Sequence, residues 1–338
     1  MPPTTYGVDI SARWFDVARG AEVRRFANTP AGIAAYLRWL GEAGGPVRVG
    51  MEATGAYHLP LAMALHEAGH TVFVCNPLSL ARYAEAVLAR TKTDATDARR
   101  IARFCEAHTL TPWRPASPAQ QRLHALVATR QALLGQIQQL RNRQGAAAYT
   151  PCAGLVAELQ APVLEALAAQ VARIDRELAA LAAAEEEPGP QLRLLTSIPG
   201  LGLVTAAALL ATLPLERLPG PRQVAAYVGL CPQERTSGSS VRGRSRTGPL
   251  GPAHLRKALY MPALVAMRAN PTLRAFADRL RAAGKRPKVI VVAVMRKLLL
   301  LAWAILRSGR PYSPTYQSAR PADSIGRLDS ARRYPYSS

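Results

Sequence analysis

Residues 1–115 alternate between short β-rich segments and helical segments, in an order that restricts the folds available to this chain. Alternating apolar residues bounded by turn formers predict strands, and apolar residues three and four apart predict helices. The expected order is three strands, helix, strand, helix, strand, helix. The five expected strands are TYGVDIS, WFDVARG, EVRRFAN, VRVGMEAT and TVFVCNP. This order predicts an α/β domain with a mixed sheet.

The predicted strand order is that of the ribonuclease-H-like nucleases. The first three strands are close enough in sequence to form a meander, and each later strand follows a helix. In this arrangement the first and fourth strands are neighbours. Side chains at their ends therefore meet from distant parts of the sequence.

Downstream of residue 116 the periodicity is that of helices alone. Two apolar stripes flank the turn-like segment AAYTPCAG, and the second stripe has heptad spacing. Its members are Leu164, Leu167, Val171, Ile174, Leu178 and Leu181. Either the two helices pack on each other or this seam pairs subunits. With a linker at EEEPGPQ, the patterns predict four regions: 1–115, 116–188, 189–312 and a basic irregular tail, 313–338.

The charge of the chain points to a polyanionic partner. Its 43 Lys and Arg exceed its 22 Asp and Glu, for a formal net charge of +21. Residues 235–338 hold 21 of those bases and three of the acids. Such an excess indicates nucleic acid or an anionic membrane. The most apolar run, 289–306, is broken by Arg296 and Lys297 into pieces too short for a span, so we expect a buried helix and no membrane insertion.

The cysteines and one histidine motif carry little weight. Four scattered cysteines without CxxC spacing indicate neither a disulfide framework nor structural zinc, and they favour the reduced cytosol. The segment HEAGH, from His66 to His70, matches the H-E-x-x-H zinc pattern. That pattern needs both histidines on one helical face, and Gly69 is expected to end the helix between them. We therefore do not expect zinc there.

Four carboxylates form the candidate metal site. Asp9 and Glu52 lie in the first and fourth strands, and Asp94 and Asp97 open the last helix of the domain on one face. Carboxylates brought together repel one another unless a cation binds, and oxygen ligands suit Mg²⁺ or Mn²⁺. The alternative is that Asp94 and Asp97 only cap the helix and favour its dipole. Asp9 and Glu52 favour the metal site, because each is an acid in an apolar strand.

A serine- and arginine-rich loop, RTSGSSVRGRSRTG, is the second candidate site. Its serines are Ser237, Ser239, Ser240 and Ser245, and its basic residues are Arg235, Arg242, Arg244 and Arg246. A serine attacks phosphorus where arginines neutralise the developing charge. The alternative is a loop that grips phosphates and whose serines only form hydrogen bonds.

Two further segments are candidates for nucleic-acid binding. Gly200 and Gly202 in SIPGLG would let backbone amides approach a phosphate at a helix start, or would simply form a tight turn between helices. Arg256 and Lys257 follow the serine loop in a helical segment and add positive charge beside it.

Taken together in order and spacing, these motifs resemble one family. The segments YGVDIS, GMEATGAYHLPLA, TKTDATDARRIARF, SIPGLG, AAYVGLCP, SGSSVRGRSR and LRKALYMPAL match it over about residues 6–312. The chain resembles the DEDD transposases of the insertion-sequence-110 family, the bridge-RNA-guided serine recombinases. One departure is that Pro249 and Leu250 stand where the family commonly carries a lysine, so that a phosphate contact is either lost or supplied by Lys257 or Arg246.

The resemblance implies a RuvC-like domain (1–115), a helical coiled-coil insertion (116–188) and a mainly helical C-terminal transposase domain (189–312). It implies that Asp9, Glu52, Asp94 and Asp97 form the acidic site and that Ser237 is the nucleophile. Implied partners are a structured bridge RNA, donor and target DNA, and further copies of the chain, as a dimer assembling to a tetramer. The implied location is the bacterial cytoplasm, at the nucleoid.

Three functions stay open on the residues alone. The first is an RNA-guided recombinase that uses Ser237 and a Mg²⁺ site. The second is a metal-dependent junction resolvase or nuclease in which the acids act without serine chemistry. The third is a basic nucleic-acid-binding protein whose acids are structural.

Overall fold

The computed structural model describes residues 4–42, 44–53, 55–87, 93–215, 218–233, 236–237, 241–242, 246–247 and 251–314, with backbone alone between 232 and 247. The chain divides into two compact units, Met1–Ala116 and Ser117–Ser338. Each unit has hydrophobic clusters of its own.

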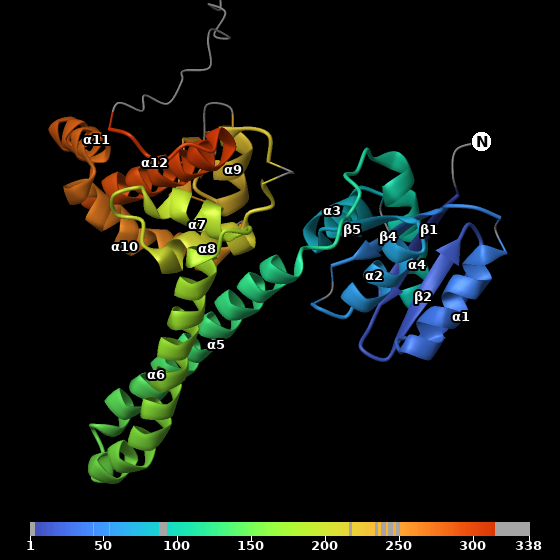
Figure 1. The fold of residues 1–338 in the computed structure, drawn as a ribbon, viewed down its shortest axis with the longest axis horizontal. Helices are drawn as coiled ribbons and strands as arrows, with labels where there is room; N and C mark the ends of the chain where they lie inside the picture. Colours follow the sequence, from blue (N-terminus) through green and yellow to red (C-terminus); the bar gives the residue numbers. More distant parts are fainter. Residues whose placement is uncertain are drawn as a thin grey trace, which may run out of the picture. The chain divides into compact units, whose positions relative to one another are not determined.

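The first unit is built on a five-stranded mixed sheet (Figure 1). Its strands are β1 (Thr5–Ile10), β2 (Trp14–Arg19), β3 (Glu22–Ala27), β4 (Arg48–Glu52) and β5 (Thr71–Cys75). Their order in the sheet is β3-β2-β1-β4-β5, with β1–β2 and β2–β3 antiparallel and β1–β4 and β4–β5 parallel. The predicted meander, the mixed sheet and the pairing of the first and fourth strands are therefore confirmed.

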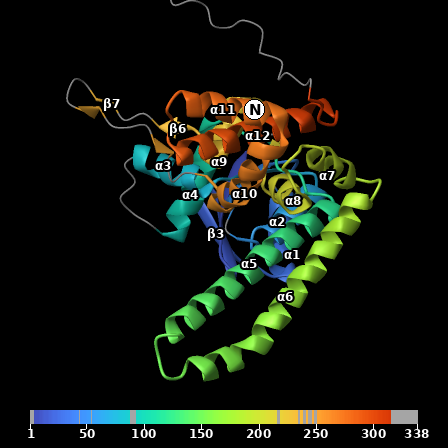
Figure 2. The same cartoon turned by 90° about the vertical axis from the view of Figure 1, so that its left-hand side faces the viewer.

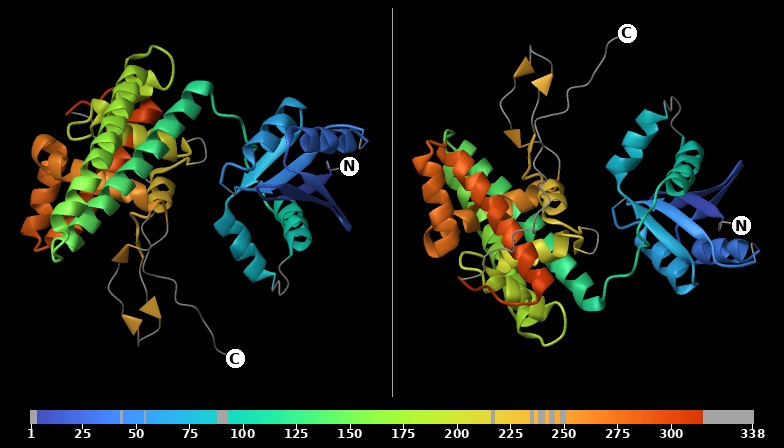
Figure 3. Two further views of the ribbon diagram at one scale, coloured as in Figure 1. Left: turned by 90° about the horizontal axis from the view of Figure 1, so that it is seen from below. Right: turned by 90° about the horizontal axis from the view of Figure 1, so that it is seen from above.

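Four helices cover the two faces of this sheet (Figure 3). They are α1 (Pro30–Gly41), α2 (Leu59–Glu67), α3 (Pro77–Ala86) and α4 (Asp94–Ala107). Because side chains alternate along a strand, Tyr6 and Val8 of β1 pack with α1 and α2, while Gly7 faces α4. On that second face Phe73 and Cys75 of β5 pack with residues of α3 and α4.

Local sequence explains where these helices begin. Thr29 and Asn76 are the N-caps of α1 and α3, and each side chain accepts a backbone N–H from the first turn. A proline follows each cap, at the position where its missing N–H costs nothing. Helix α1 accordingly begins at Pro30.

The second unit begins with two long helices, α5 (Pro118–Ala147) and α6 (Ala153–Ala183), joined by a short turn (Figure 2). They pack on each other as a hairpin, with Arg130 of α5 bonded to Asp175 of α6 through Nε–Oδ1 (2.7 Å) and Nη2–Oδ2 (3.2 Å). Ile174, Leu178 and Leu181 of the heptad seam are buried. Of the two alternatives for the seam, this part packs within the chain.

Six shorter helices follow in the described part of the second unit. They are α7 (Gly189–Thr196), α8 (Leu203–Thr212), α9 (Pro221–Val228), α10 (Ala253–Ala269), α11 (Pro271–Ala282) and α12 (Pro287–Ser308). The apolar run at 289–306 is α12, which packs against α7, α9, α10 and α11 and has eight buried residues. The expectation of a buried helix is confirmed.

Among the described helices, α6 and α12 are long and apolar enough to cross a membrane by length and composition. This is weak evidence for a span, because the core helix of a soluble protein passes the same test. In α12, 44% of the most apolar stretch is buried inside the protein, whereas none of the corresponding stretch of α6 is. Helix α6 therefore exposes apolar surface.

The predicted serine- and arginine-rich loop contains short strands. They are β6 (Pro232–Gln233), β7 (Thr236–Ser237), β8 (Val241–Arg242) and β9 (Arg246–Thr247). β6 pairs with β9 and β7 with β8, both antiparallel, with Ser237 opposite Val241 (β6 and β7 are labelled in Figure 2). Runs of Gly, Ser and Arg lack the apolar alternation by which strands are recognised in a sequence.

Candidate acidic active site

The alternation of side chains along the strands places three acids on the α4 side of the sheet. Val8 and Met51 are buried on the opposite side, so their neighbours Asp9 and Glu52 point toward α4. Val8 is also the register partner of Met51 on the parallel pair β1–β4, which sets Asp9 and Glu52 in step. Asp16 of β2 lies directly opposite Asp9 and shares its face.

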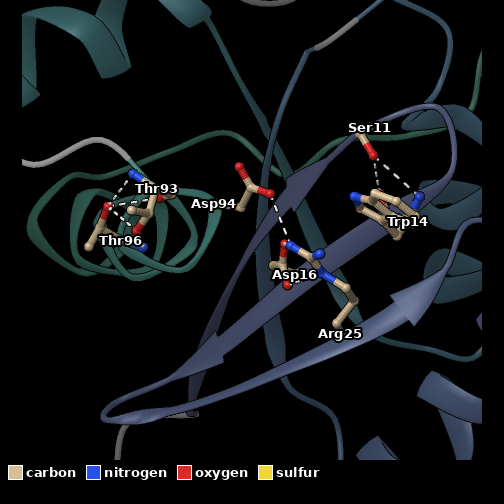
Figure 4. Close-up of polar contacts among 7 residues, drawn as sticks. All are labelled: Ser11, Trp14, Asp16, Arg25, Thr93, Asp94 and Thr96. Atoms are coloured by element: carbon tan, nitrogen blue, oxygen red, sulfur yellow. Dashed lines mark hydrogen bonds and ion pairs between the residues drawn. The ribbon is translucent and has the colours of Figure 1, made fainter.

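The start of α4 brings the other two acids. Thr93 is the N-cap, and it forms a reciprocal capping box with Thr96, whose hydroxyl accepts the Thr93 N–H at 2.9 Å (Figure 4). Asp94 and Asp97 lie in the first turn, where the helix dipole favours negative charge. In the capping alternative Asp94 was expected to be the cap; the structure gives that role to Thr93.

Two glycines allow α4 to lie close to the sheet. A Cβ on Gly7 would lie 2.0 Å from the carbonyl oxygen of Ala98, and a Cβ on Gly50 would lie 2.2 Å from the Sγ of Cys105. Gly7 and Gly50 are register partners on β1 and β4. Any larger side chain at Gly7 would push the helix outward, so the small residues help to bring the helix acids toward the strand acids.

The electrostatics of Asp9 show that the acids interact. Burial, followed by the charges of Asp97, Asp94, Glu52 and Asp16, raises the pKa of Asp9 from its ordinary value of 3.8 to about 6. All three of the other predicted site acids contribute to this shift. The structure thus brings Asp9, Glu52, Asp94 and Asp97 into one electrostatic cluster.

The sequence reasoning missed two members of this cluster, Asp16 and Arg25 (Figure 4). Asp16 is buried, and Arg25, its cross-strand partner on β3, donates to it from Nε (2.9 Å) and Nη2 (2.8 Å). Nη2 of Arg25 also donates to Asp94 at 3.0 Å. The alignment of WFDVARG with EVRRFAN as a hairpin was the available signal, because that register sets Asp9, Asp16 and Arg25 in one row.

The donor set fits a hard divalent cation, since its groups are carboxylates alone. The cluster is also crowded with negative charge, which a cation would relieve. Three of its acids have cationic partners, because Asp16 and Asp94 bind Arg25 and Asp97 binds Arg100 at 2.6 Å. Within the described parts of the chain, no group of three or more His, Cys, Asp or Glu is close enough to hold a metal as it stands.

The histidines of HEAGH do not share a helical face. α2 ends at Glu67, just after His66, and Gly69 follows with φ +82°, so His70 lies beyond the helix. The ring of His66 packs edge-on against Trp113, and Nδ1 of His70 accepts the N–H of Val47 at 3.4 Å. The placement that the zinc pattern needs, with both histidines on one helical face, is therefore not met by these two residues.

The predicted nucleophile and most of its arginines lie at the edge of what the structure describes. Ser237 is in β7, Arg242 in β8 and Arg246 in β9, each described by its backbone. Arg235 and Arg244 lie outside the described residues. Their roles stay predictions.

The remaining predicted binding residues have differing surroundings. A Cβ on Gly200, whose φ is +98°, would lie 2.8 Å from the backbone of Ala266, so this glycine has a packing reason of its own. Gly202 precedes α8 as its N-cap and has open space around it among the described atoms. Lys257 is exposed, whereas Nη1 of Arg256 donates to the carbonyls of Val228 (3.0 Å) and Gly251 (3.1 Å).

Comparisons with known proteins identify the class. Residues 7–147 match a family described as "Transposase", of the DEDD type, and residues 192–278 match "Transposase IS116/IS110/IS902 family". The pilin gene-inverting protein of Moraxella lacunata is 30% identical over 321 residues, covering 92% of this chain and 98% of that protein. An uncharacterized 43.6 kDa protein of insertion element IS110 from Streptomyces coelicolor is 33% identical over 164 residues, covering 47% and 39%. A putative transposase of Sinorhizobium fredii is 28% identical over 306 residues, covering 79% and 74%.

With an α/β unit that carries a cluster of acids and a basic helical unit, these similarities define an enzyme that acts on DNA as a transposase or recombinase. The chain belongs to the IS110 family of transposases.

Proposed function

We propose that this transposase cuts and rejoins donor and target DNA under the guidance of a structured bridge RNA, with Ser237 as nucleophile and a divalent-metal site formed by Asp9, Glu52, Asp94 and Asp97. The observation that carries the metal site is the cluster around Asp9, whose pKa is raised to about 6 by burial and by the three other acids. Isolated structural acids on a solvated surface have no such mutual effect.

Mg²⁺ or Mn²⁺ is the cation that these four carboxylates would hold. When bound, it supplies positive charge that stabilises the attacking and leaving oxygens of a phosphodiester. The protein's part is to keep two strand acids and two helix acids on one face of the sheet. Gly7 supports this by letting α4 lie close to β1.

The serine step would replace one phosphodiester with another. The Oγ of Ser237 attacks the phosphorus and loses its proton, a DNA oxygen leaves and takes up a proton, and a phosphoserine link to DNA results. A DNA hydroxyl then attacks the same phosphorus and regenerates the serine. Arg235, Arg242, Arg244 and Arg246 would neutralise the charge that develops.

The partners follow from charge and from family. The excess of bases in residues 235–338 supports binding of DNA and RNA through their phosphates. Where base pairing with a guide reads the sequence, the protein needs to recognise only shape and backbone. Gly200, Gly202, Arg256 and Lys257 belong to the same proposed surface.

For the domains we propose a RuvC-like domain (1–115), a coiled-coil region (116–188), a transposase domain (189–312) and a basic tail (313–338). The α5–α6 hairpin supports assembly into dimers and tetramers. Leu155, Leu159 and Val163 recur every four residues on α6 and are 56%, 67% and 48% exposed. An apolar face of this kind fits a second copy of the chain.

The decisive experiment compares Ser237→Ala with Ser245→Ala in the same loop. Protein expressed with its native flanking DNA is purified, the RNA that it retains is sequenced, and cleavage of donor and target DNA is measured with Mg²⁺. We expect one discrete RNA, a covalent protein–DNA adduct for the wild type and for Ser245→Ala, and neither cleavage nor adduct for Ser237→Ala, with nucleic-acid binding nearly unchanged.

Metal-dependent nicking that persists in Ser237→Ala, without an adduct, would instead identify a resolvase or nuclease in which the acids act alone. Retained RNA of random sequence would remove the guide from the proposal and leave binding driven by charge. Full activity of Glu52→Gln would remove the metal site.

A further inference from the structure

Among the residues that the structure describes, Arg25 is the cation that contacts two acids of the site at once. Its Nε and Nη2 grip both oxygens of Asp16, at 2.9 and 2.8 Å, and the same Nη2 donates to Oδ2 of Asp94 at 3.0 Å (Figure 4). The guanidinium also lies over the ring of Trp14, with its central carbon 5.2 Å from the ring centroid. Arg25 therefore joins strand β3 to the first turn of α4.

The two ends of this bridge differ in strength. The Asp16 side chain is 7% exposed and accepts two hydrogen bonds in a side-on pair, which is the strong form of an arginine–carboxylate contact. The Asp94 side chain is 58% exposed and receives one bond. Exposed ion pairs contribute little to stability, so the contact to Asp94 is the one that gives way.

We propose that Arg25 is the resident counter-ion of the acidic site: it holds Asp94 while no metal is bound and surrenders that carboxylate to a divalent cation, staying anchored to Asp16. This inference rests on the proposed metal binding by Asp94. It goes beyond that proposal because it gives a role to Arg25, which lies outside the four acids.

Arg25 and a metal ion would compete for Asp94. Nη2 and a cation would use the same acid, and a guanidinium keeps its charge at every pH at which the protein is folded. Asp94 is therefore neutralised in either state, by Arg25 or by the metal. Arg25 remains in place after the exchange, because Asp16 and Trp14 hold it.

The test measures the affinity of the protein for Mn²⁺ in the absence of nucleic acid. Isothermal titration calorimetry gives this affinity, as does the loss of the electron paramagnetic resonance signal of free Mn²⁺. The main variant is Arg25→Gln combined with Asp16→Asn, which removes one positive and one negative charge and leaves no unpaired buried carboxylate. We expect its affinity for Mn²⁺ to rise by about two- to fivefold, the range set by the loss of one exposed ion pair.

Two companions keep the result interpretable. Arg24→Gln removes a charge from the neighbouring position of β3, where Arg24 pairs with Glu22 and lies over Trp39, and it should leave Mn²⁺ affinity within about 1.5-fold of the wild type. Arg25→Lys keeps the charge but cannot reproduce the side-on fork, and it serves if the double variant does not fold. We expect it to bind Mn²⁺ about twofold more tightly.

The outcomes separate the two proposals. Tighter Mn²⁺ binding in the Arg25 variants, without a change in Arg24→Gln, supports the counter-ion role. Unchanged or weaker binding overturns it, and weaker binding would mean that Arg25 positions Asp94 for the metal. If neither the wild type nor any variant binds Mn²⁺, the metal site itself fails, and the counter-ion role fails with it.

Discussion

Asp9 and Asp16 lie directly opposite each other on the antiparallel strands β1 and β2, yet only Asp16 has an arginine partner bound in a side-on pair. Asp16 is neutralised by Arg25, whereas Asp9 is partly buried among carboxylates that raise its pKa to about 6. The pair shows how one face of the sheet holds both a compensated acid and one that a cation would stabilise.

Asp9→Asn should stabilise the metal-free protein at neutral pH. Because folding raises the pKa of Asp9 from 3.8 to about 6, the native state holds the proton more tightly, and stability falls as pH rises through that window. Above it the loss is complete, so at pH 7.5 with a chelator the variant should gain about 1–2 kcal/mol in free energy of unfolding. The gain should disappear below about pH 4, as followed by denaturant titration.

The control for this prediction is Glu85→Gln, an exposed acid of α3 that pairs with Arg82. It should change stability by less than about 0.5 kcal/mol at either pH. A gain for Asp9→Asn that is equally large at pH 4 would show that the effect is not due to ionisation.

Gly7→Ala should destabilise the first unit by about 3 kcal/mol. The added Cβ would lie 2.0 Å from the Ala98 carbonyl oxygen and 2.4 Å from the Ala102 nitrogen, and both are helix backbone that cannot rotate away. Because α4 would have to move outward, DNA cleavage should fall as well. Gly41→Ala, at the end of α1 with no described atom within 4 Å, should be neutral or slightly stabilising.

Thermal unfolding monitored by circular dichroism measures both variants. If Gly7→Ala unfolds at the same temperature as the wild type, the close approach of α4 to β1 is wrong. Activity lost without any loss of stability would place the effect in the site alone.

Arg256→Ala and Lys257→Ala should separate a structural base from a binding base. Arg256 donates to two carbonyls on either side of the serine segment, so its removal should cost about 1–3 kcal/mol of stability. Lys257 is exposed, and its removal should leave stability unchanged while reducing the salt slope of DNA binding by about 1. Equal losses of DNA affinity with equal stability in both variants would contradict this division.

Asn270→Ala should be more damaging than Asn76→Ala, although both residues are N-caps. Asn270 is fully buried, and its Oδ1 accepts from the Leu273 N–H and the Tyr312 hydroxyl, both at 3.1 Å. Its loss leaves the buried Leu273 N–H and the partly buried Tyr312 hydroxyl without this acceptor, at a cost of about 2–3 kcal/mol. Asn76 caps α3 in solvent, where water replaces it, and its loss should cost at most about 1 kcal/mol. Chemical denaturation of both variants measures the difference.

The fold of the first unit could be predicted because its signals are local. Strand alternation and helical periodicity each depend on a few adjacent residues. The short strands around Ser237 could not be predicted, because Gly, Ser and Arg give no apolar alternation. Their pairing also depends on which residues lie opposite each other in space. The division of Arg256 from Lys257 also depended on neighbours from distant segments.

The candidate acids could be predicted one by one, whereas their partners depend on strand register. Asp9 and Glu52 stood out as charges in apolar strands, and Asp94 and Asp97 as a pair at a helix start. Arg25 reads in the sequence as one more base in EVRRFAN, a segment with two adjacent arginines. Only the register of β2 with β3 distinguishes Arg25, opposite Asp16, from Arg24, opposite Val17.

The sequence by itself determined the order of strands and helices, the basic character of the C-terminal half and the identity of the acids, because periodicity and charge are properties of neighbouring residues. Only the tertiary structure decided which charges meet. Cross-strand register sets Arg25 opposite Asp16. Gly7 lets α4 lie close to the sheet, where Asp94 contacts Arg25. Asp9 lies among other carboxylates. Electrostatic energy depends on distance in space, and that distance is set by packing.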